Sequence, residues 1–274
     1  MAEIRELYAQ MLRIRMVEEA IADRYSEQEM RCPVHLSIGQ EAPAAAFSLV
    51  ALKRDFAVST HRAHAHYLAK GGDLSAMIAE LYGKITGCSK GIGGSMHLAD
   101  KAAGFMGSSA IVGNSIPVGV GLGLSIQVRQ TDAISWVFLG DAATEEGAYY
   151  EGVNFSVLKK LPVLFMCENN GFSVYSDESV RRPPSQKIFE VADSLGCKST
   201  EVDGNNAAES YRVVSEMSDY VRSGGGPGLI EFHTFRQREH CGPNFDDHLN
   251  YRAPEYLARW EDADPILRLK AELQ

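Results

Sequence analysis

Long hydrophobic runs are missing from this sequence. No apolar run approaches the roughly 20 residues that a helix needs to cross a bilayer. The first residues include Glu3, Arg5 and Glu6, whereas a secretory signal peptide would be apolar there. We therefore expect a cytoplasmic protein with no membrane partner.

Clusters of basic residues and paired cysteines are absent as well. The formal charge is −9 and no basic stripe appears, which argues against a nucleic-acid partner. The cysteines are scattered without a C-x-x-C pair, so neither a zinc site nor a disulfide framework is indicated. Cys167 lies inside an apolar run and is expected to be a core residue.

The sequence does contain a regular alternation of strand-like and helical segments, with no repeat and no break in composition. At 274 residues and 45% hydrophobic, the chain is long enough for a sizeable core. We predict one α/β domain over residues 1–274, with a doubly wound, mostly parallel sheet and helices on both faces. Residues 3–25 have apolar side chains at helical spacing and predict an N-terminal helical arm. This arm either packs on its own domain or serves as a subunit contact.

Residues 133–172 give the clearest local prediction. Apolar runs at residues 133–139 and 162–167 are typical of buried strands, and residues 144–160 between them are typical of a helix. Because such a βαβ crossover makes the two strands parallel, their carboxyl ends lie at the same edge of the sheet. Asp141 and Asn170 should therefore face each other across a crevice.

The side chains expected at this edge suggest the ligand. Two oxygen ligands such as Asp141 and Asn170 suit Mg²⁺ carrying a diphosphate, because Mg²⁺ prefers octahedral oxygen coordination and keeps phosphate oxygens as ligands. The small residues Ala142 and Ala143 would let backbone N–H groups and the start of a helix approach the phosphates.

The same stretch resembles a known motif. Gly140-Asp141-Ala142 followed by Asn169-Asn170 is similar to the thiamine diphosphate motif, which is Gly-Asp-Gly followed after a fixed interval by Asn-Asn. Ala142 departs from the motif, which has glycine at this position. Alanine costs roughly 1 kcal/mol if the backbone there needs a positive φ, and is tolerated if it does not.

From about residue 7 to residue 269, the chain resembles the alpha subunit of the first component of pyruvate and acetoin dehydrogenases. The resemblance implies a thiamine diphosphate-binding fold. It also implies that Asp141, Asn170 and the carbonyl of Phe172 hold the metal, with Ala142 and Ala143 beside the cofactor.

Residues 60–66 follow a predicted strand at residues 55–59 and contain three histidines and an arginine. Their spacing fits no standard zinc site. An arginine fork aimed at a diphosphate fits better, because it supplies charge-assisted, bidentate hydrogen bonds. The segment resembles the family's Tyr-Arg-x-His-Gly, which implies that Arg62 and His61 bind the phosphate end and that His64 lines the mouth of the active site.

Further matches to the family complete the predicted site. His35 resembles a histidine that faces the oxoacid, although a lone histidine before a helix is more often structural. By the same resemblance, backbone groups of Ala110 and Val112 bind the aminopyrimidine ring and His240 reaches the diphosphate. The glycine-rich loop at residues 87–97 resembles a family loop that packs near the cofactor.

Two other segments carry weaker predictions. Gly119, Gly121 and Gly123 stand inside a predicted helix, where each costs about 1 kcal/mol relative to alanine, and so suggest close approach of another backbone. The polar segment at residues 173–187, which contains Arg181 and Arg182, predicts a loop at the entrance of the site.

The resemblance implies thiamine diphosphate-dependent decarboxylation of a pyruvate-like 2-oxoacid, with acyl transfer to an acceptor such as lipoyl-lysine. Since the family supplies the activating glutamate from a beta chain, the expected partners are a beta-type subunit in an alpha2beta2 heterotetramer and a lipoyl acyltransferase. One alternative is a transketolase-like or other carboligating subunit, which the altered residues around His240 and the short C-terminal tail favour. Another is a degenerate regulatory subunit.

Overall fold

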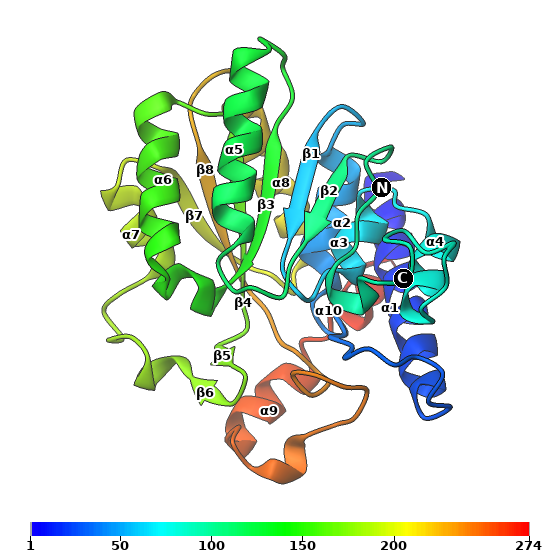
Figure 1. Cartoon of the computed structure of the whole chain (residues 1–274). Coiled ribbons are helices and arrows are strands. Elements are labelled where there is room, and N and C mark those ends of the chain that lie inside the picture. Colours follow the sequence, from blue (N-terminus) through cyan, green and yellow to red (C-terminus); the bar gives the residue numbers. More distant parts are fainter. Residues whose placement is uncertain (1, 274) are drawn as a thin grey trace.

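The computed structural model describes residues 2–273, which are built around a six-stranded parallel sheet in the order β2-β1-β3-β4-β8-β7 (Figure 1). Its strands are β1 (Phe56–Ser59), β2 (Phe105–Ser108), β3 (Ser135–Gly140), β4 (Val163–Asn169), β7 (Lys198–Asp203) and β8 (Gly228–His233). A short antiparallel pair, β5 (Phe172–Ser173) and β6 (Ser176–Asp177), lies outside this sheet. The prediction of a doubly wound parallel sheet is confirmed.

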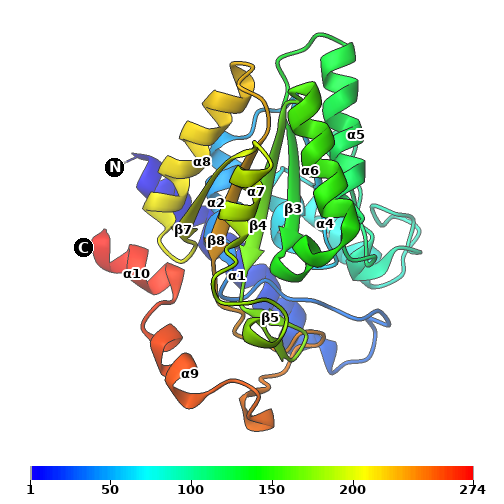
Figure 2. The ribbon, with the colours of Figure 1, turned by 90° about the vertical axis from the view of Figure 1, so that its left-hand side faces the viewer.

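Helices cover both faces of the sheet (Figure 2). One face carries α5 (Ser115–Val128), α6 (Gly147–Lys159) and α7 (Ile188–Ser194). The other carries α2 (Glu41–Val50), α3 (His64–Ala69) and α8 (Ala207–Arg222), with α1 (Ala2–Tyr25) packed against α2. The remaining helices are α4 (Leu74–Leu81), α9 (Pro254–Glu261), α10 (Pro265–Glu272) and the 3-10 turns η1 (Gly94–Met96), η2 (Asp141–Glu145), η3 (Glu178–Val180) and η4 (Asp247–Leu249).

The strand β3 shows why the central strands are apolar throughout. Trp136 and Phe138 pack against Phe47 of α2, with ring centroids 5.0 and 5.1 Å apart. The alternate residues Val137 and Leu139 belong to the core cluster on the side of α5. Because both faces of a parallel sheet are covered, its strands are continuous hydrophobic runs instead of alternating ones.

The N-terminal arm packs on its own chain. Leu7, Met11 and Ile14 of α1 are buried, and α1 lies along α2 and α10. Its apolar face therefore packs inside the chain, as the first of the two predicted roles requires. Among residues 2–273, no helix is both long and apolar enough to cross a membrane.

The glycines of α5 approach side chains of the sheet. A Cβ atom on Gly119 would lie 2.2 Å from Cγ2 of Val137, and one on Gly123 would lie 2.4 Å from Cγ2 of Val163. Gly121 points the other way, into open space. At Gly119 and Gly123 the predicted approach of another backbone is wrong, because valine side chains of β3 and β4 fill the space.

Candidate functional site

The loops that follow β1, β3, β4 and β8 meet at the carboxyl edge of the sheet and enclose a cavity of about 140 Å³. Ligands of open parallel sheets bind at this edge, where neighbouring strands feed loops into one crevice. Nine residues predicted from the sequence line the cavity: His61, Arg62, Val112, Asp141, Ala142, Ala143, Asn170, Phe172 and His240.

Asp141 and Asn170 form the oxygen-rich side of the cavity. They lie close because Gly140 of β3 pairs with Glu168 of β4, so both residues follow adjacent strand ends. Asn170 is held by its Nδ2, which donates to Oε1 of Gln40 at 3.2 Å. Burial raises the pKa of the Asp141 carboxyl, although the guanidinium of Arg181 opposes the rise. A buried carboxylate beside an amide oxygen is a donor set that suits a hard cation.

Arg62 lies on the opposite side and lacks an acidic partner. Its guanidinium donates to the carbonyl oxygens of Leu36 at 2.6 Å and His240 at 3.1 Å. Only 5% of the residue is exposed, and among the described residues no carboxylate lies within ion-pair distance of it, although the charges of Glu168 and Glu18 act on it from further away. Burial lowers the pKa of Arg62 to about 9. Since a buried charge is costly unless it is paired, the geometry fits an anionic ligand in the cavity.

Three imidazoles surround this arginine. The ring of His35 lies 4.6 Å from that of His61 and 5.2 Å from that of His240, measured between centroids. Nδ1 of His35 is buried and has no hydrogen-bond partner within residues 2–273. Burial, reinforced by the charge of Arg62, lowers the pKa of His35 to about 2, that of His61 to about 4 and that of His240 to about 3.

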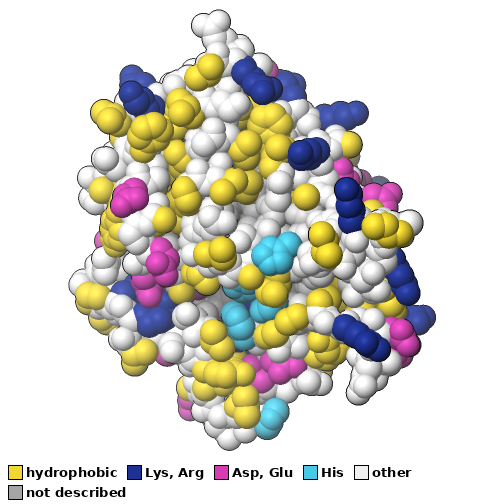
Figure 3. All heavy atoms as spheres, in the orientation of Figure 1, with side chains coloured by type: hydrophobic (Ala, Val, Ile, Leu, Met, Phe, Trp, Pro, Cys, Tyr) yellow, Lys and Arg dark blue, Asp and Glu magenta, His cyan; other side chains and the backbone are white. Residues whose placement is uncertain are grey.

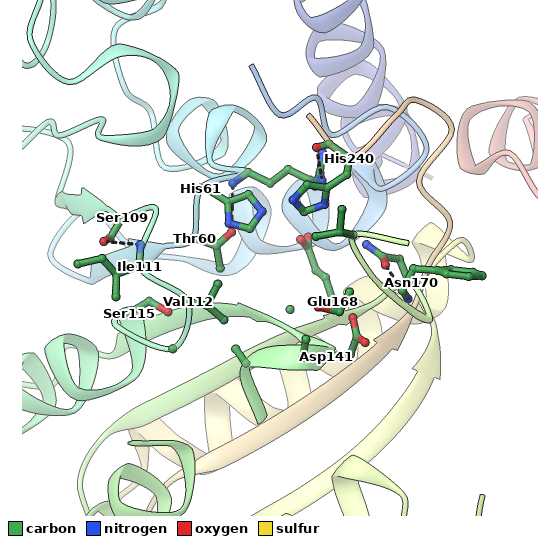
Figure 4. Close-up of a pocket in the computed structure, with 18 of the residues that line it drawn as sticks. Thr60, His61, Ser109, Ile111, Val112, Ser115, Asp141, Glu168, Asn170 and His240 are labelled. Carbon is green, nitrogen blue, oxygen red and sulfur yellow. Dashed lines mark hydrogen bonds between the residues drawn. The ribbon is translucent and has the colours of Figure 1, made fainter. Parts of the chain in front are cut away.

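These histidines are therefore neutral at pH 7, and each can donate one N–H. Ring nitrogens of all three lie within 4.8 Å of one another, which also makes them a geometric candidate for a metal site. The adjacent charge of Arg62 opposes a second cation, so phosphate oxygens suit this group better than a metal. Figure 4 shows His61 and His240 across the cavity from Asp141.

The departure at Ala142 does not strain the backbone. Among the described residues, Ala142 is not one of the non-glycine residues with a positive φ. The methyl group is therefore tolerated, and the cost considered for a left-handed backbone does not arise. Ala142 and Ala143 both line the cavity.

His64 requires a correction. Among the described residues it is not one that lines the cavity, and it is fully buried at the start of α3. Its Nδ1 lies 2.9 Å from Oε2 of Glu18, and its Nε2 lies 2.7 Å from Oγ of Ser95. Both ring nitrogens are engaged inside the chain, so His64 does not line the mouth of the site. His35 is also not in the cavity wall, but it contacts two histidines that are.

The glycine-rich loop at residues 87–97 also differs from its prediction. It folds around the carboxylate of Glu80, which accepts hydrogen bonds from the backbone N–H groups of Ser89, Gly91, Gly93 and Gly94. Among the described residues, none from this loop lines the cavity. Ala110 is not in the cavity wall either, although its neighbours Ser109 and Ile111 are.

Sequence reasoning missed Glu168, which lines the cavity between the two sides (Figure 4). Its Oε1 lies 3.0 Å from Nε2 of His66, and Nδ1 of His66 lies 2.7 Å from Oγ of Ser59. His66 thereby holds a carboxylate at the cavity wall. A signal was present, because Glu168 directly precedes Asn169-Asn170 at the predicted strand end.

Comparison with known proteins adds independent information. Residues 9–274 match the family described as "Dehydrogenase E1 component". The pyruvate dehydrogenase E1 component subunit alpha of Rickettsia typhi is 35% identical over 263 residues, covering 96% of this chain and 79% of that protein. The alpha subunit of the acetoin:2,6-dichlorophenolindophenol oxidoreductase of Bacillus subtilis is 36% identical over 234 residues, covering 85% and 70%.

Solved structures with the same fold include transketolases. One from Pichia stipitis superposes with a TM-score of 0.65 at 16% identity, covering 99% of this chain and 45% of the transketolase. One from Campylobacter jejuni gives a TM-score of 0.65 at 15% identity, covering 98% and 46%. The chain thus spans less than half of each transketolase, and at this identity the likeness concerns the fold alone. The family match and the relatives confirm the prediction from the motifs: the chain belongs to the dehydrogenase E1 component family and is similar to its alpha subunits.

Proposed function

We propose that this chain is the alpha subunit of a thiamine diphosphate-dependent 2-oxoacid dehydrogenase that acts on a small, pyruvate-like substrate. The observation that carries the proposal is that one cavity has a buried cationic side chain on one side and oxygen ligands for a cation on the other. Arg62 is buried without an acidic partner, while Asp141 and Asn170 on the other side offer oxygen ligands. A diphosphate with a divalent cation satisfies both sides at once. The relatives named as pyruvate dehydrogenase alpha subunits support the same choice.

Each side of the cavity then has a role. Asp141, Asn170 and the carbonyl of Phe172 would hold Mg²⁺, and Arg62, His61 and His240 would bind the diphosphate. Backbone groups near Ala110 and Val112 would meet the aminopyrimidine ring. When bound, thiamine diphosphate supplies the electron sink that decarboxylation of a 2-oxoacid requires.

The residues of this chain bind, orient and exchange protons. Arg62 would offset phosphate charge and the neutral imidazoles would donate hydrogen bonds, through N–H groups that are fixed before the ligand arrives, which avoids reorganisation during the reaction. His35 stands behind His61 and His240 with a free Nδ1, and is the candidate for orienting the substrate and exchanging a proton with it. His64 has no part in this proposal, because its ring is held elsewhere.

The site also indicates a partner subunit. At the cavity rim Ile111 is 69% exposed and Val112 is 51% exposed. Hydrophobic side chains gather over α5 and α6 on the same face of the molecule (Figure 3). The exposed ones are Val118, Leu124 and Val128 on α5 and Tyr150, Phe155 and Leu158 on α6.

We propose that a beta-type subunit covers this face and completes the site in an alpha2beta2 heterotetramer, from which a lipoyl acyltransferase accepts the acyl group. An obligate assembly of this type buries more than about 2,000 Å². The transketolase-like alternative is supported by the fold alone. The cytoplasmic location stays a prediction from the sequence.

The test is an assay of 2-oxoacid decarboxylation with an artificial electron acceptor, for the chain alone and for the chain co-expressed with a beta-type partner. We expect activity only from the pair, because the chain alone leaves the cavity rim open to water. Circular dichroism of the lone chain serves as the control for folding. Full activity of the lone folded chain would refute the two-chain proposal. A pair that transfers ketol groups between sugars but leaves 2-oxoacids unchanged would refute the dehydrogenase.

A further inference from the structure

Arg181 and Arg182 lie on a loop that the sequence predicts at the entrance of the site, but their side chains lie elsewhere. They approach η2, the turn that carries Asp141, and line a second hollow together with Glu145 and Tyr149. Neither arginine is among the residues that line the main cavity. Asp141 therefore lines the main cavity, while the two arginines line the second hollow.

Arg181 is held tightly against Asp141. Its Nη2 donates to Oδ2 of Asp141 at 2.5 Å, its Nη1 donates to Oε1 of Glu145, and its Nε donates to the carbonyl oxygen of Ser176 at 3.2 Å. Only 10% of its side chain is exposed. A guanidinium with all three nitrogens engaged has one orientation, and charge-assisted bonds of this kind are the strong ones.

Arg182 fixes the backbone of the same turn. Its Nη2 lies 3.0 Å from the carbonyl oxygen of Asp141, 3.2 Å from Oγ1 of Thr144 and 3.0 Å from Oε1 of Glu145. Glu145 thus bridges both arginines. Two neighbouring guanidinium groups therefore hold the turn that carries Asp141, one through its carboxylate and one through its carbonyl oxygen.

We propose that Arg181 is a positioning residue that holds Oδ2 of Asp141 and leaves Oδ1 available as a ligand for the metal. This inference rests on the proposed function, which makes Asp141 a metal ligand. Carboxylates that bind a metal are usually hydrogen-bonded by a further residue, and loss of that residue typically lowers metal affinity by roughly 10- to 100-fold.

The arrangement allows the opposite role, in which Arg181 is a counter-ion that must leave before the metal binds. Two features favour positioning. Arg181 lines the second hollow and binds Oδ2 of Asp141, whereas Asp141 itself lines the main cavity. Glu145 and the carbonyl oxygen of Ser176 hold Arg181 independently of Asp141, so its place does not depend on the absence of a metal.

The experiment measures Mg²⁺ affinity by calorimetry at saturating thiamine diphosphate, on the full chain co-purified with its beta-type partner. For Arg181→Met we expect Mg²⁺ affinity to fall by roughly 10- to 100-fold. Thiamine diphosphate affinity at saturating Mg²⁺ should stay within about threefold of the original, and Arg181→Lys should recover part of the Mg²⁺ loss. If Arg181 were purely structural, its loss would not lower Mg²⁺ affinity while keeping thiamine diphosphate affinity.

Arg222→Met is the matched control. Arg222 makes two hydrogen bonds to the buried Asp55 and is 17% exposed, but Asp55 lies just before β1, at the opposite edge of the sheet. Its removal should leave Mg²⁺ affinity unchanged. If Arg181→Met does not fold, Glu145→Gln loosens Arg181 without removing it, and a smaller loss of Mg²⁺ affinity is then expected.

Unchanged or tighter Mg²⁺ binding in folded Arg181→Met, or unchanged binding in Glu145→Gln, would overturn the inference. Tighter binding would identify Arg181 as a competitor of the metal. Asp141→Ala separates this failure from that of the proposed function. If Asp141→Ala loses Mg²⁺-dependent binding while Arg181→Met keeps it, only the role of Arg181 is wrong; if Asp141→Ala binds normally, the metal site itself is wrong.

Discussion

His64 and Glu18 form a hydrogen bond between Nδ1 and Oε2, 2.9 Å long, in the interior of the protein, where both side chains are fully buried. The second ring nitrogen of His64 contacts Oγ of Ser95 at 2.7 Å. This chain of contacts ties α1 to the start of α3 and to η1. It gives His64 a structural role, and the histidines of the cavity wall are His61 and His240, with His35 packed against both.

We predict that His64→Ala lowers the free energy of unfolding by about 2–4 kcal/mol, because it leaves the carboxylate of Glu18 and the hydroxyl of Ser95 buried without this partner. Urea unfolding of the two proteins measures the difference. His97→Ala is the control, since His97 is exposed and should change stability by less than about 0.5 kcal/mol. An equally small effect at His64 would contradict the structural role.

His35→Ala should behave differently. The family resemblance makes His35 the candidate for proton exchange with the substrate, and its ring contacts two histidines of the cavity wall. We expect turnover of the oxoacid to fall by roughly 10²–10⁴-fold, while calorimetry shows thiamine diphosphate affinity largely kept. Normal turnover of the variant would mean that His35 only packs against its neighbours.

The contrast between these histidines shows where the sequence is informative. The apolar runs on either side of Asp141 predict buried parallel strands, and parallel strands bring Asp141 and Asn170 to one edge whatever the rest of the chain does. His61 and His64 stand in one short segment, and their directions depend on where α3 begins. Sequence spacing did not reveal where α3 begins. The sequence therefore could not show that His61 lines the cavity while His64 points into the interior.

Residues that act through tertiary contacts were out of reach for the same reason. His66 meets Glu168 across 102 positions of the chain, and Arg181 meets Asp141 across 40. No local sequence pattern predicts such a pair. The two glycines of α5 that face the sheet were recognised from the local sequence, but the predicted neighbour was a backbone and the observed one is a valine side chain.

Acid should weaken the fold through the cavity histidines. The pKa values of His35, His61 and His240 lie at about 2, 4 and 3, below the ordinary 6.5, mainly because of burial. The unfolded chain therefore takes up protons first as the pH falls. Their stabilising contribution is complete above about pH 6.5 and is lost progressively toward the folded pKa values.

We predict that the free energy of unfolding falls between about pH 6.5 and 4.5, and that the double variant His61→Gln, His240→Gln falls less steeply. Urea unfolding at several pH values measures both slopes. Equal slopes for the two proteins would show that these imidazoles do not carry the dependence.

Ala142→Gly tests the departure from the motif. Ala142 does not have a positive φ, so replacing it with glycine should leave thiamine diphosphate affinity within about threefold of the original. The free energy of unfolding should fall by up to about 1 kcal/mol, because glycine loses more backbone entropy on folding than alanine. Calorimetry and thermal unfolding give the two values. A large gain in affinity would mean that the alanine methyl group distorts the loop.

The most direct test of the central claim is calorimetric titration of thiamine diphosphate into the complex with its beta-type partner, at matched Mg²⁺, for the original chain and for Asp141→Ala. Asp141 is the one acidic ligand proposed for the metal that carries the diphosphate. We predict Mg²⁺-dependent binding by the original chain and its loss in the variant. Undiminished affinity in folded Asp141→Ala would contradict the assignment of this cavity as the cofactor site.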